Sequence, residues 1–322
     1  MKIYRSLEAV PADFGPCALT IGNFDGVHVG HRLIMWRLVA LAARHGWKPS
    51  VLTFDPHPTR VVAPERTPPL LTSPLQRAGL MAAEGVEQAL ILPFVPEIAR
   101  LSPREFVRRV LAERLQTRAV LVGENFRFGC QHSGDARLLE KLGKEHGFET
   151  EIVAASACRG RRVSSSAIRE MVRAGRISTA NRFLGRPYAV EGEVARGRGI
   201  GSKLTVPTLN LTTSAEVLPA RGVYATRTAD LDAARVWDSV TNIGERPTFE
   251  DGGGLSIETF LLDPLTSPPP RRILVEFLWR VRDERKFENP EALKTRILHD
   301  AGAARRYFRR VKAWVAGPAA PA

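Results

Sequence analysis

Short apolar runs alternate with amphipathic segments through the first half of the chain. The apolar runs have the length and composition of buried strands, and they lie at residues 18–22, 50–54, 88–93, 119–123 and 149–154. Helical periodicity follows each run, at residues 31–45, 73–84, 102–115, 133–146 and from 164 onward. Five strands that alternate with helices predict a doubly wound parallel α/β sheet of the Rossmann-like kind.

The pattern changes near Gly185-Arg186-Pro187, where strand-like runs begin to follow one another without helices between them. Six such runs predict a small antiparallel Greek-key β-barrel; they lie at residues 188–195, 205–211, 223–229, 236–243, 255–262 and 273–280. One terminal helix is expected from Pro290, with Asn289 as its N-cap, to about residue 311. We therefore expect domains at 1–184 and 185–316, and a disordered tail at 317–322.

Composition and charge limit the classes of partner. The chain has 322 residues, and 47 lysines and arginines against 34 acidic residues give a formal net charge of +13. This balance suits nucleotides, nucleic acid or acidic lipid, and the basic residues are spread along the chain rather than gathered in tracts. Three cysteines without metal-like spacing, no signal peptide and no long apolar span predict a cytoplasmic protein without a membrane anchor.

The first strand is joined to the first helix by the ten residues Gly22-Asn23-Phe24-Asp25-Gly26-Val27-His28-Val29-Gly30-His31. A strand, a glycine-containing turn and a helix start form an anion site, because free N–H groups and the positive end of the helix dipole meet there. His28 and His31 add donors of the kind that stabilise charge on a departing pyrophosphate. Two other interpretations remain: the histidines cap and pack the helix, or they bind zinc together with Asp25.

Other unusual loops follow the ends of predicted strands. His57 lies in a stiff turn, Asn125, Phe126 and Phe128 follow the fourth strand, and three consecutive serines with Arg169 one turn later open the fifth helix. The carboxyl ends of parallel strands form the rim where open α/β sheets bind ligands, so these loops should converge on one cleft. The two phenylalanines either form a platform for a flat ring or a small apolar cluster beneath the loop.

The second half carries candidate chemistry of a different kind. Thr208 and Asn210 lie two residues apart on one face of a strand, and their oxygens suit Mg²⁺ and a nucleotide phosphate. Glu258 is the one carboxylate in an apolar strand, on the face opposite Ile257. It is either an ordinary solvent-facing residue or a general base beside a magnesium-bound nucleotide.

Taken together, the motifs resemble those of the bacterial bifunctional riboflavin kinase/FAD synthetase family, within the nucleotidylyltransferase superfamily. The resemblance covers residues 15 to 312 and rests on motifs at residues 22–31, 53–58, 123–129, 163–169, 207–210, 222–225, 242–249, 258–263 and 282–287. It implies that the barrel transfers the γ-phosphate of ATP to riboflavin, and that the N-terminal domain adenylylates the resulting FMN to FAD and releases pyrophosphate.

The resemblance also implies roles for individual residues. Glu258, His28, His31, Ser164 and Arg169 would be catalytic, and Thr208 and Asn210 would bind Mg²⁺ and ATP. Further ATP contacts would come from Gly22, Asn23, Phe24, Asp25 and Gly30, and flavin contacts from Asn125, Phe126, Phe128, His57 and Arg282.

Three alternatives stay open at this point. Only one half could be active, the transferase could act on another phosphate, or the protein could be a non-catalytic basic RNA-binding protein on a nucleotidyltransferase fold, with steeply salt-dependent binding. The expected partners are riboflavin, FMN, FAD and ATP, without nucleic acid or membrane. A transient homo-oligomer is compatible with the sequence.

Overall fold

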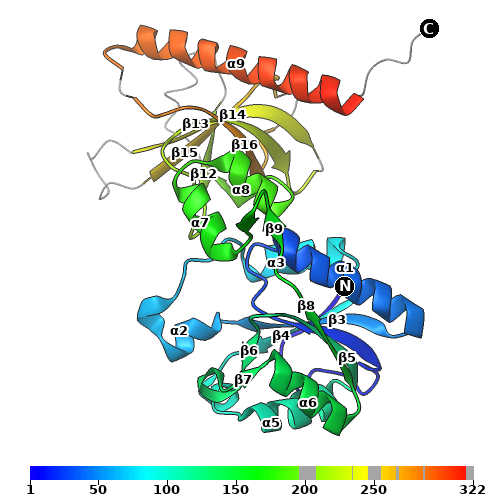
Figure 1. The fold of residues 1–322 in the computed structure, drawn as a ribbon. Helices are drawn as coiled ribbons and strands as arrows, with labels where there is room; N and C mark the ends of the chain where they lie inside the picture. The colour runs from blue at the N-terminus through cyan, green and yellow to red at the C-terminus, as the bar shows by residue number, and fades with distance from the viewer. Residues whose placement is uncertain (196–207, 234, 246–254, 266–267, 286, 317–322) are drawn as a thin grey trace, which may run out of the picture. The chain divides into compact units, whose positions relative to one another are not determined.

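The computed structural model describes residues 1–195, 208–233, 235–245, 255–265, 268–285 and 287–316 (Figure 1). Internal contacts divide the chain into two compact units, Met1–Ser165 and Ser166–Ala322. The tail predicted to be disordered, residues 317–322, lies outside the described residues. So do residues 205–207 of the predicted strand 205–211, and residues 207, 246–249 and 286 of the quoted motifs.

The first unit is built on a parallel sheet with the strand order β1-β4-β3-β2-β5-β8. Its strands are β1 (Lys2–Tyr4), β2 (Cys17–Ile21), β3 (Lys48–Asp55), β4 (Gln88–Pro93), β5 (Thr117–Gly123) and β8 (Glu149–Val153). The predicted parallel α/β sheet is confirmed, and β1 is an additional strand at one edge. β2, which carries the first loop, lies inside the sheet between β3 and β5.

Helices cover both faces of this sheet (Figure 1). The elements between the strands are α1 (Val29–His45), α2 (Pro58–Val62), η1 (Pro64–Arg66), α3 (Pro74–Ala83), α4 (Pro96–Ala99), α5 (Pro103–Phe106) with its π-helical continuation η2 (Val107–Arg114), η3 (Cys130–His132) and α6 (Ala136–His146). Met35 of α1 and Met81 of α3 pack with Val51 on one face, whereas Leu111 and Leu139 pack on the other. This two-sided packing explains the continuous apolar runs of the strands.

Two short antiparallel ladders follow the strands that carry candidate residues. β6 (Arg127–Phe128) pairs with β7 (Gly134–Asp135), and β9 (Ala157–Cys158) pairs with β10 (Arg161–Arg162). They have no signature in the sequence, because two-residue strands show no period and β9–β10 is rich in arginine.

The second unit contains a closed antiparallel barrel with the strand order β11-β12-β15-β14-β13-β16. Its strands are β11 (Tyr188–Ala195), β12 (Thr208–Thr212), β13 (Gly222–Asp230), β14 (Val236–Glu245), β15 (Leu255–Leu261) and β16 (Arg272–Arg282). The last four strands lie in the order β16-β13-β14-β15, which is the Greek-key arrangement predicted from the sequence.

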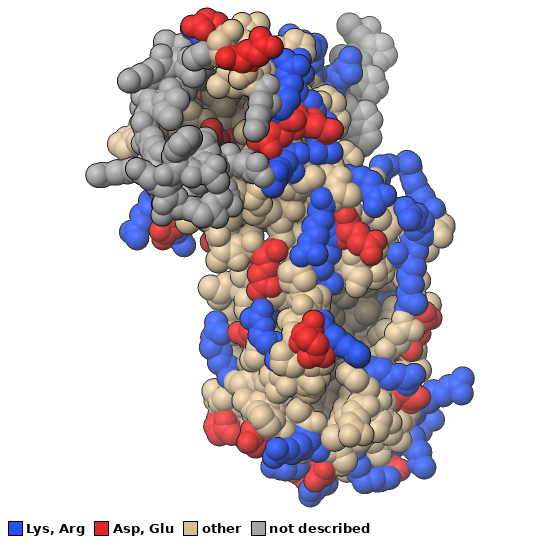
Figure 2. Space-filling model, turned by 90° about the vertical axis from the view of Figure 1, so that its left-hand side faces the viewer, with Lys and Arg blue, Asp and Glu red and all other residues tan. Residues whose placement is uncertain are grey.

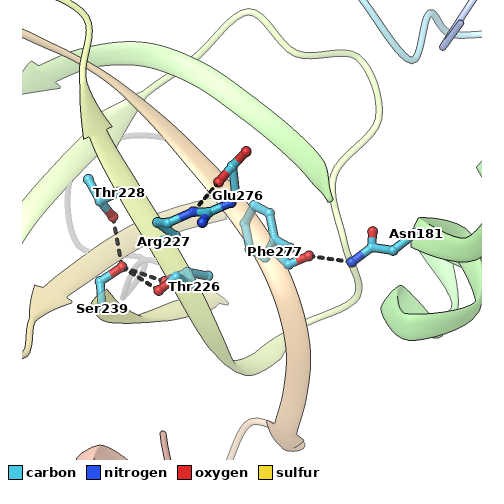
Figure 3. A network of polar contacts seen from close by, with 7 residues as sticks. All are labelled: Asn181, Thr226, Arg227, Thr228, Ser239, Glu276 and Phe277. Atoms are coloured by element: carbon cyan, nitrogen blue, oxygen red, sulfur yellow. Dashed lines mark hydrogen bonds and ion pairs between the residues drawn. The ribbon is translucent and has the colours of Figure 1, made fainter. Parts of the chain in front are cut away.

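Two helices precede the barrel and are attached to it. They are α7 (Ser165–Arg173) and α8 (Ile177–Leu184). Asn181 of α8 donates to the carbonyl of Phe277 at 2.8 Å (Figure 3). It also accepts from the N–H of Tyr188 at 2.8 Å, so one side chain joins α8 to β16 and β11. Ala220 N–H also donates to the carbonyl of Val172 in α7 at 3.3 Å.

Hydroxyl groups occupy part of the barrel interior. Ser239 Oγ lies 2.8 Å from the hydroxyls of both Thr226 and Thr228, as Figure 3 shows. Thr226 continues the chain to Thr241 at 2.7 Å, and Thr241 reaches Thr259 at 3.0 Å. These fully buried hydroxyls satisfy one another, which offsets the cost of placing polar groups in a core.

The terminal helix α9 (Pro290–Ala316) covers the outside of the barrel. Asn289 caps it through a 2.8 Å bond from Ala292 N–H, as predicted. Ala304 and Phe308 pack against Val223 and Val240 of the strands. The helix therefore shields the part of the outer barrel wall that its own apolar face contacts.

Charge and cysteine chemistry add little to this architecture. On the face shown in Figure 2, basic and acidic side chains are interspersed. The three cysteines are free thiols, and burial raises the pKa of Cys17 to about 11. Within the described residues, every helix is too short or too polar to cross a membrane.

Candidate active sites

The loop from Gly22 to His31 connects β2 to α1 and is held by its own buried side chains. Phe24 and Val27 have left-handed backbones, with φ of 49° and 37°, and are 3% and 1% exposed. A left-handed non-glycine residue costs about 1–3 kcal/mol. Burial of the two apolar side chains beside Met35 offsets that cost and fixes the turn.

His28 and His31 stand together at the start of α1. Their rings are stacked, with centroids 3.6 Å apart, and the edge of Phe24 contacts His31. His28 is the N-cap, and its Nδ1 accepts from the N–H of His31 at 3.3 Å. In the neutral ring the proton is then on Nε2, which leaves that nitrogen as a donor. His28 can therefore cap the helix through Nδ1 and still offer Nε2 as a donor to a phosphate, so the two interpretations of this residue are compatible.

The first turn of α1 contains no acidic side chain, so the positive end of the helix dipole is not neutralised there. Gly30 is needed for space, because a Cβ at this position would lie 3.2 Å from the His28 ring. These features together form a helix start with two imidazoles, of the kind that can bind an anion.

Asp25 has a role that the sequence did not reveal. Its carboxylate is 2% exposed and accepts from the N–H groups of Leu71 and Thr72 at 3.0 and 3.1 Å. Thr72 Oγ1 in turn accepts from Gly26 N–H at 3.1 Å. Asp25 therefore clamps the loop to the segment before α3. Among the described residues, no group of three or more His, Cys, Asp or Glu side chains is arranged to hold a metal ion. The zinc interpretation of Asp25, His28 and His31 therefore finds no support in their arrangement.

The loop also contacts the turn after β3 and the start of α7. The Asn23 amide lies 3.0 Å from Nε2 of His57, which caps α2 by accepting from Thr59 N–H. Ser165 Oγ donates to the carbonyl of Asp25 at 2.9 Å. Ser164, which the sequence singled out, is half-buried next to it. Arg169 lies further along α7, in the second unit, and is 8% exposed.

The candidate flavin loop after β5 combines a core residue with exposed ones. Phe128 is 7% exposed and belongs to the main core, whereas Phe126 is half-buried and stacks on it at 5.5 Å. Asn125 is exposed, and with its amide turned its oxygen accepts from Arg162 of β10. Phe128 thus has the packing role that the apolar-cluster interpretation expected, while Phe126 and Asn125 present surface.

In the barrel, the two predicted oxygen ligands and the carboxylate lie on adjacent strands. Asn210 of β12 pairs with Glu258 of β15, which pairs on its other side with Asn242 of β14. Directly paired residues point to the same face of a sheet, so amide, carboxylate and amide stand in one row. Thr208 lies two residues before Asn210 and therefore on that face. Glu258 is exposed and Ile257 is 4% exposed, as the alternation predicted.

A second carboxylate lies near the same row. A Cβ placed on Gly244 would be 2.4 Å from Glu284 Oε1 and 3.1 Å from Asn242 Nδ2. Glu284 therefore packs against the bare backbone of Gly244, beside Asn242, and was not identified from the sequence.

Arg282 makes contacts that the sequence did not predict. Its Nε and Nη2 lie 2.8 Å from Oδ2 of Asp300 in α9, and its Nη1 donates to the carbonyl of Asp283. All three guanidinium nitrogens thus have protein partners. Arg296 is also paired with Asp300, at 3.2 Å. The buried Asp300 and these two half-buried arginines join α9 to the end of β16.

Comparisons with known proteins match both units. The family profile for FAD synthetase matches residues 10–167, and the profile for riboflavin kinase matches residues 184–308. A bifunctional riboflavin kinase/FMN adenylyltransferase of Pseudomonas fluorescens is 37% identical over 305 residues, which cover 95% of this chain and 97% of that protein. The protein of that name from Escherichia coli K12 is 33% identical over 97% of this chain and 99% of its own length.

One solved structure shares the fold. It is described as a macrolide-efflux protein from Streptococcus pneumoniae and matches with a TM-score of 0.84, over 94% of this chain and 98% of its own. At 24% sequence identity this similarity speaks for the fold alone.

Proposed function

Because this chain belongs to the family of bifunctional riboflavin kinase/FMN adenylyltransferases, we propose that the two candidate sites divide its two reactions between them. The enzyme phosphorylates riboflavin to FMN with ATP, and it joins AMP from a second ATP to FMN, which gives FAD and pyrophosphate. The assignment of residues to each step is our proposal. We place the adenylyltransferase in residues 1–184 and the kinase in residues 185–316.

The observation that carries the kinase assignment is the row of Asn210, Glu258 and Asn242. The attacking hydroxyl of riboflavin must lose a proton, and Glu258 accepts it while the oxygen attacks the γ-phosphorus of ATP and ADP leaves. Thr208 and Asn210 hold the phosphates. Hydroxyl, amide and carboxylate oxygens are the ligands that Mg²⁺ prefers, so the donor set fits this ion. When bound there, Mg²⁺ would neutralise charge on the phosphates.

The adenylyltransferase needs alignment and charge stabilisation rather than a base, because the FMN phosphate is ionised at neutral pH. Its oxygen attacks the α-phosphorus of ATP, the bond from that phosphorus to the bridging oxygen breaks, and pyrophosphate leaves. His28 Nε2, His31 and the start of α1 bind the departing charge. Ser164 and Arg169 assist them, and the backbone of Gly22, Asn23, Phe24, Asp25 and Gly30 approaches the nucleotide.

The flavin ring would lie against Phe126 and Asn125, and Phe128 would support Phe126 from the core. His57, in the turn after β3, would contribute a further flavin contact. For Arg282 we propose a contribution to flavin binding through the segment that its bond to Asp283 holds, because its guanidinium is occupied by Asp300. We further propose that the enzyme is cytoplasmic, binds neither nucleic acid nor membrane, and forms at most transient homo-oligomers.

The substitution Glu258→Gln tests the kinase assignment, since it keeps the size and removes the base. We expect riboflavin phosphorylation to fall by about 100-fold or more, with adenylylation of added FMN unchanged. Both rates are measured in the same preparation by chromatography of the flavins. An unchanged kinase rate, or an equal loss of both activities, would contradict the assignment.

A further inference from the structure

Arg77, near the middle of α3 (Pro74–Ala83), is the feature of the first unit that the assigned roles leave unexplained. Its side chain is among the buried residues of this helix, and the residue is only 2% exposed. A buried guanidinium is costly unless it is paired and hydrogen-bonded, so its retention requires a compensating interaction. An arginine in a surface helix ordinarily extends into water.

The hydrogen-bond partner of the Arg77 guanidinium is a carbonyl of the Gly22–His31 loop. Arg77 Nη1 donates to the backbone carbonyl of Asn23. The same carbonyl accepts a longer bond, 3.4 Å, from Thr53 Oγ1 of β3. One peptide unit near the start of the Gly22–His31 loop is therefore held from two neighbouring elements, and the Asn23 side chain extends the connection to His57.

The charges around Arg77 also connect it to this loop. Burial lowers the pKa of Arg77, whereas the carboxylates of Asp25 and Asp55 raise it. Arginine stays protonated in proteins despite such shifts, so a positive charge is fixed next to the Asn23 carbonyl. It offsets the two carboxylates, which would otherwise repel the phosphates of a nucleotide bound at the start of α1.

We propose that Arg77 is a positioning residue of the adenylyltransferase site. Through the Asn23 carbonyl it fixes the peptide plane that sets the direction of the following N–H groups, and its charge keeps the loop receptive to ATP. The proposal rests on the assignment of this loop to ATP and names a residue that no part of that assignment uses.

The test compares three variants of the full chain. Arg77→Met removes donor and charge, Arg77→Lys keeps the charge and one donor, and Arg114→Met is the matched control. Arg114 is a half-buried arginine of the same unit that donates to the carbonyls of Leu7, Glu8 and Val10, none of which belongs to the loop. The readouts are KM for ATP, KM for FMN and kcat in adenylylation, with riboflavin phosphorylation measured alongside.

We expect Arg77→Met to raise KM for ATP by about tenfold or more, with KM for FMN within about twofold of wild type. Arg77→Lys should recover most of that loss. Arg114→Met should leave KM for ATP unchanged even where it lowers the melting temperature, because a fold defect reduces the amount of active enzyme and hence the apparent kcat alone.

An unchanged KM for ATP in Arg77→Met, whatever happens to kcat, would overturn the proposal, as would an equal rise in Arg114→Met. Failure of the underlying assignment gives a different result. In that case His28→Asn would leave adenylylation intact, which is measured independently of the Arg77 variants.

Discussion

His28 combines a structural and a chemical role in one imidazole. Its Nδ1 caps α1, which in the neutral ring places the proton on Nε2 and makes that nitrogen a donor. The stacked His31 ring and the missing side chain at Gly30 keep the ring in place. A residue with only a capping role could be replaced by another cap, and this difference allows the two roles to be separated.

We expect His28→Asn to retain helix stability, because asparagine is among the best N-caps, whereas His28→Ala should cost about 1 kcal/mol. Both variants lose the Nε2 donor, so both should lose FMN adenylylation by about 100-fold or more. Thermal unfolding and the adenylylation rate measure the two effects. Loss of activity in the alanine variant alone would assign His28 a purely structural role.

At the scale of elements, the barrel site depends on how α9 is fixed. The helix lies on the outer wall of the barrel, and its polar anchor is Asp300, whose side chain is 3% exposed between Arg282 and Arg296. Breaking a buried ion pair costs about 3–5 kcal/mol because it leaves an uncompensated charge. Arg282 also holds the backbone at Asp283, next to the residue that packs on Gly244.

Asp300→Asn keeps the shape of the side chain and removes its charge. We expect it to lower the stability of the second unit by about 3 kcal/mol and to reduce riboflavin phosphorylation, with FMN adenylylation retained. Denaturant unfolding and both rates report the effect. Glu140→Gln is the control, because Glu140 pairs with Lys144 on the exposed surface of α6, where an ion pair contributes little. An equal effect of both substitutions would exclude the anchoring role.

Elements were predictable where a local rule decides them. The capping boxes at Ser73 and Ser102 and the αL glycine after α6 are local signals, and the helices begin or end there. β1 and the β9–β10 hairpin were missed because their few residues are ordered by partners elsewhere in the fold. The role of Arg77 was not predicted for the same reason, because its hydrogen-bond partner is a carbonyl that is 54 residues away in the chain.

At the scale of the whole molecule, the sequence pattern and the contacts place α7 and α8 differently. The change of pattern at Gly185 predicts a boundary after α8, whereas the contact units divide at Ser165, before most of α7. The family matches end at 167 and resume at 184, which leaves most of both helices between them. Asn181 connects α8 to two barrel strands, so the barrel uses this helix for its own stability.

Two fragments test that dependence. We expect residues 166–322 to fold and to phosphorylate riboflavin, and residues 185–322 to be less stable by several kcal/mol. The loss combines about 1 kcal/mol for each Asn181 hydrogen bond with about 2 kcal/mol for each large apolar side chain of α8 that leaves the core. Equal denaturation midpoints for the two fragments would show that α8 contributes nothing to the barrel.

The most direct measurement of two independent sites is a time course of riboflavin, ATP and Mg²⁺ with Glu258→Gln and His28→Asn, first alone and then mixed. Alone, Glu258→Gln should leave riboflavin unchanged yet convert added FMN to FAD, and His28→Asn should accumulate FMN. Mixed, they should make FAD from riboflavin, because FMN released by one variant is adenylylated by the other. If the mixture makes no FAD although each variant keeps its own step, or if either variant loses both steps, the division between two sites is contradicted.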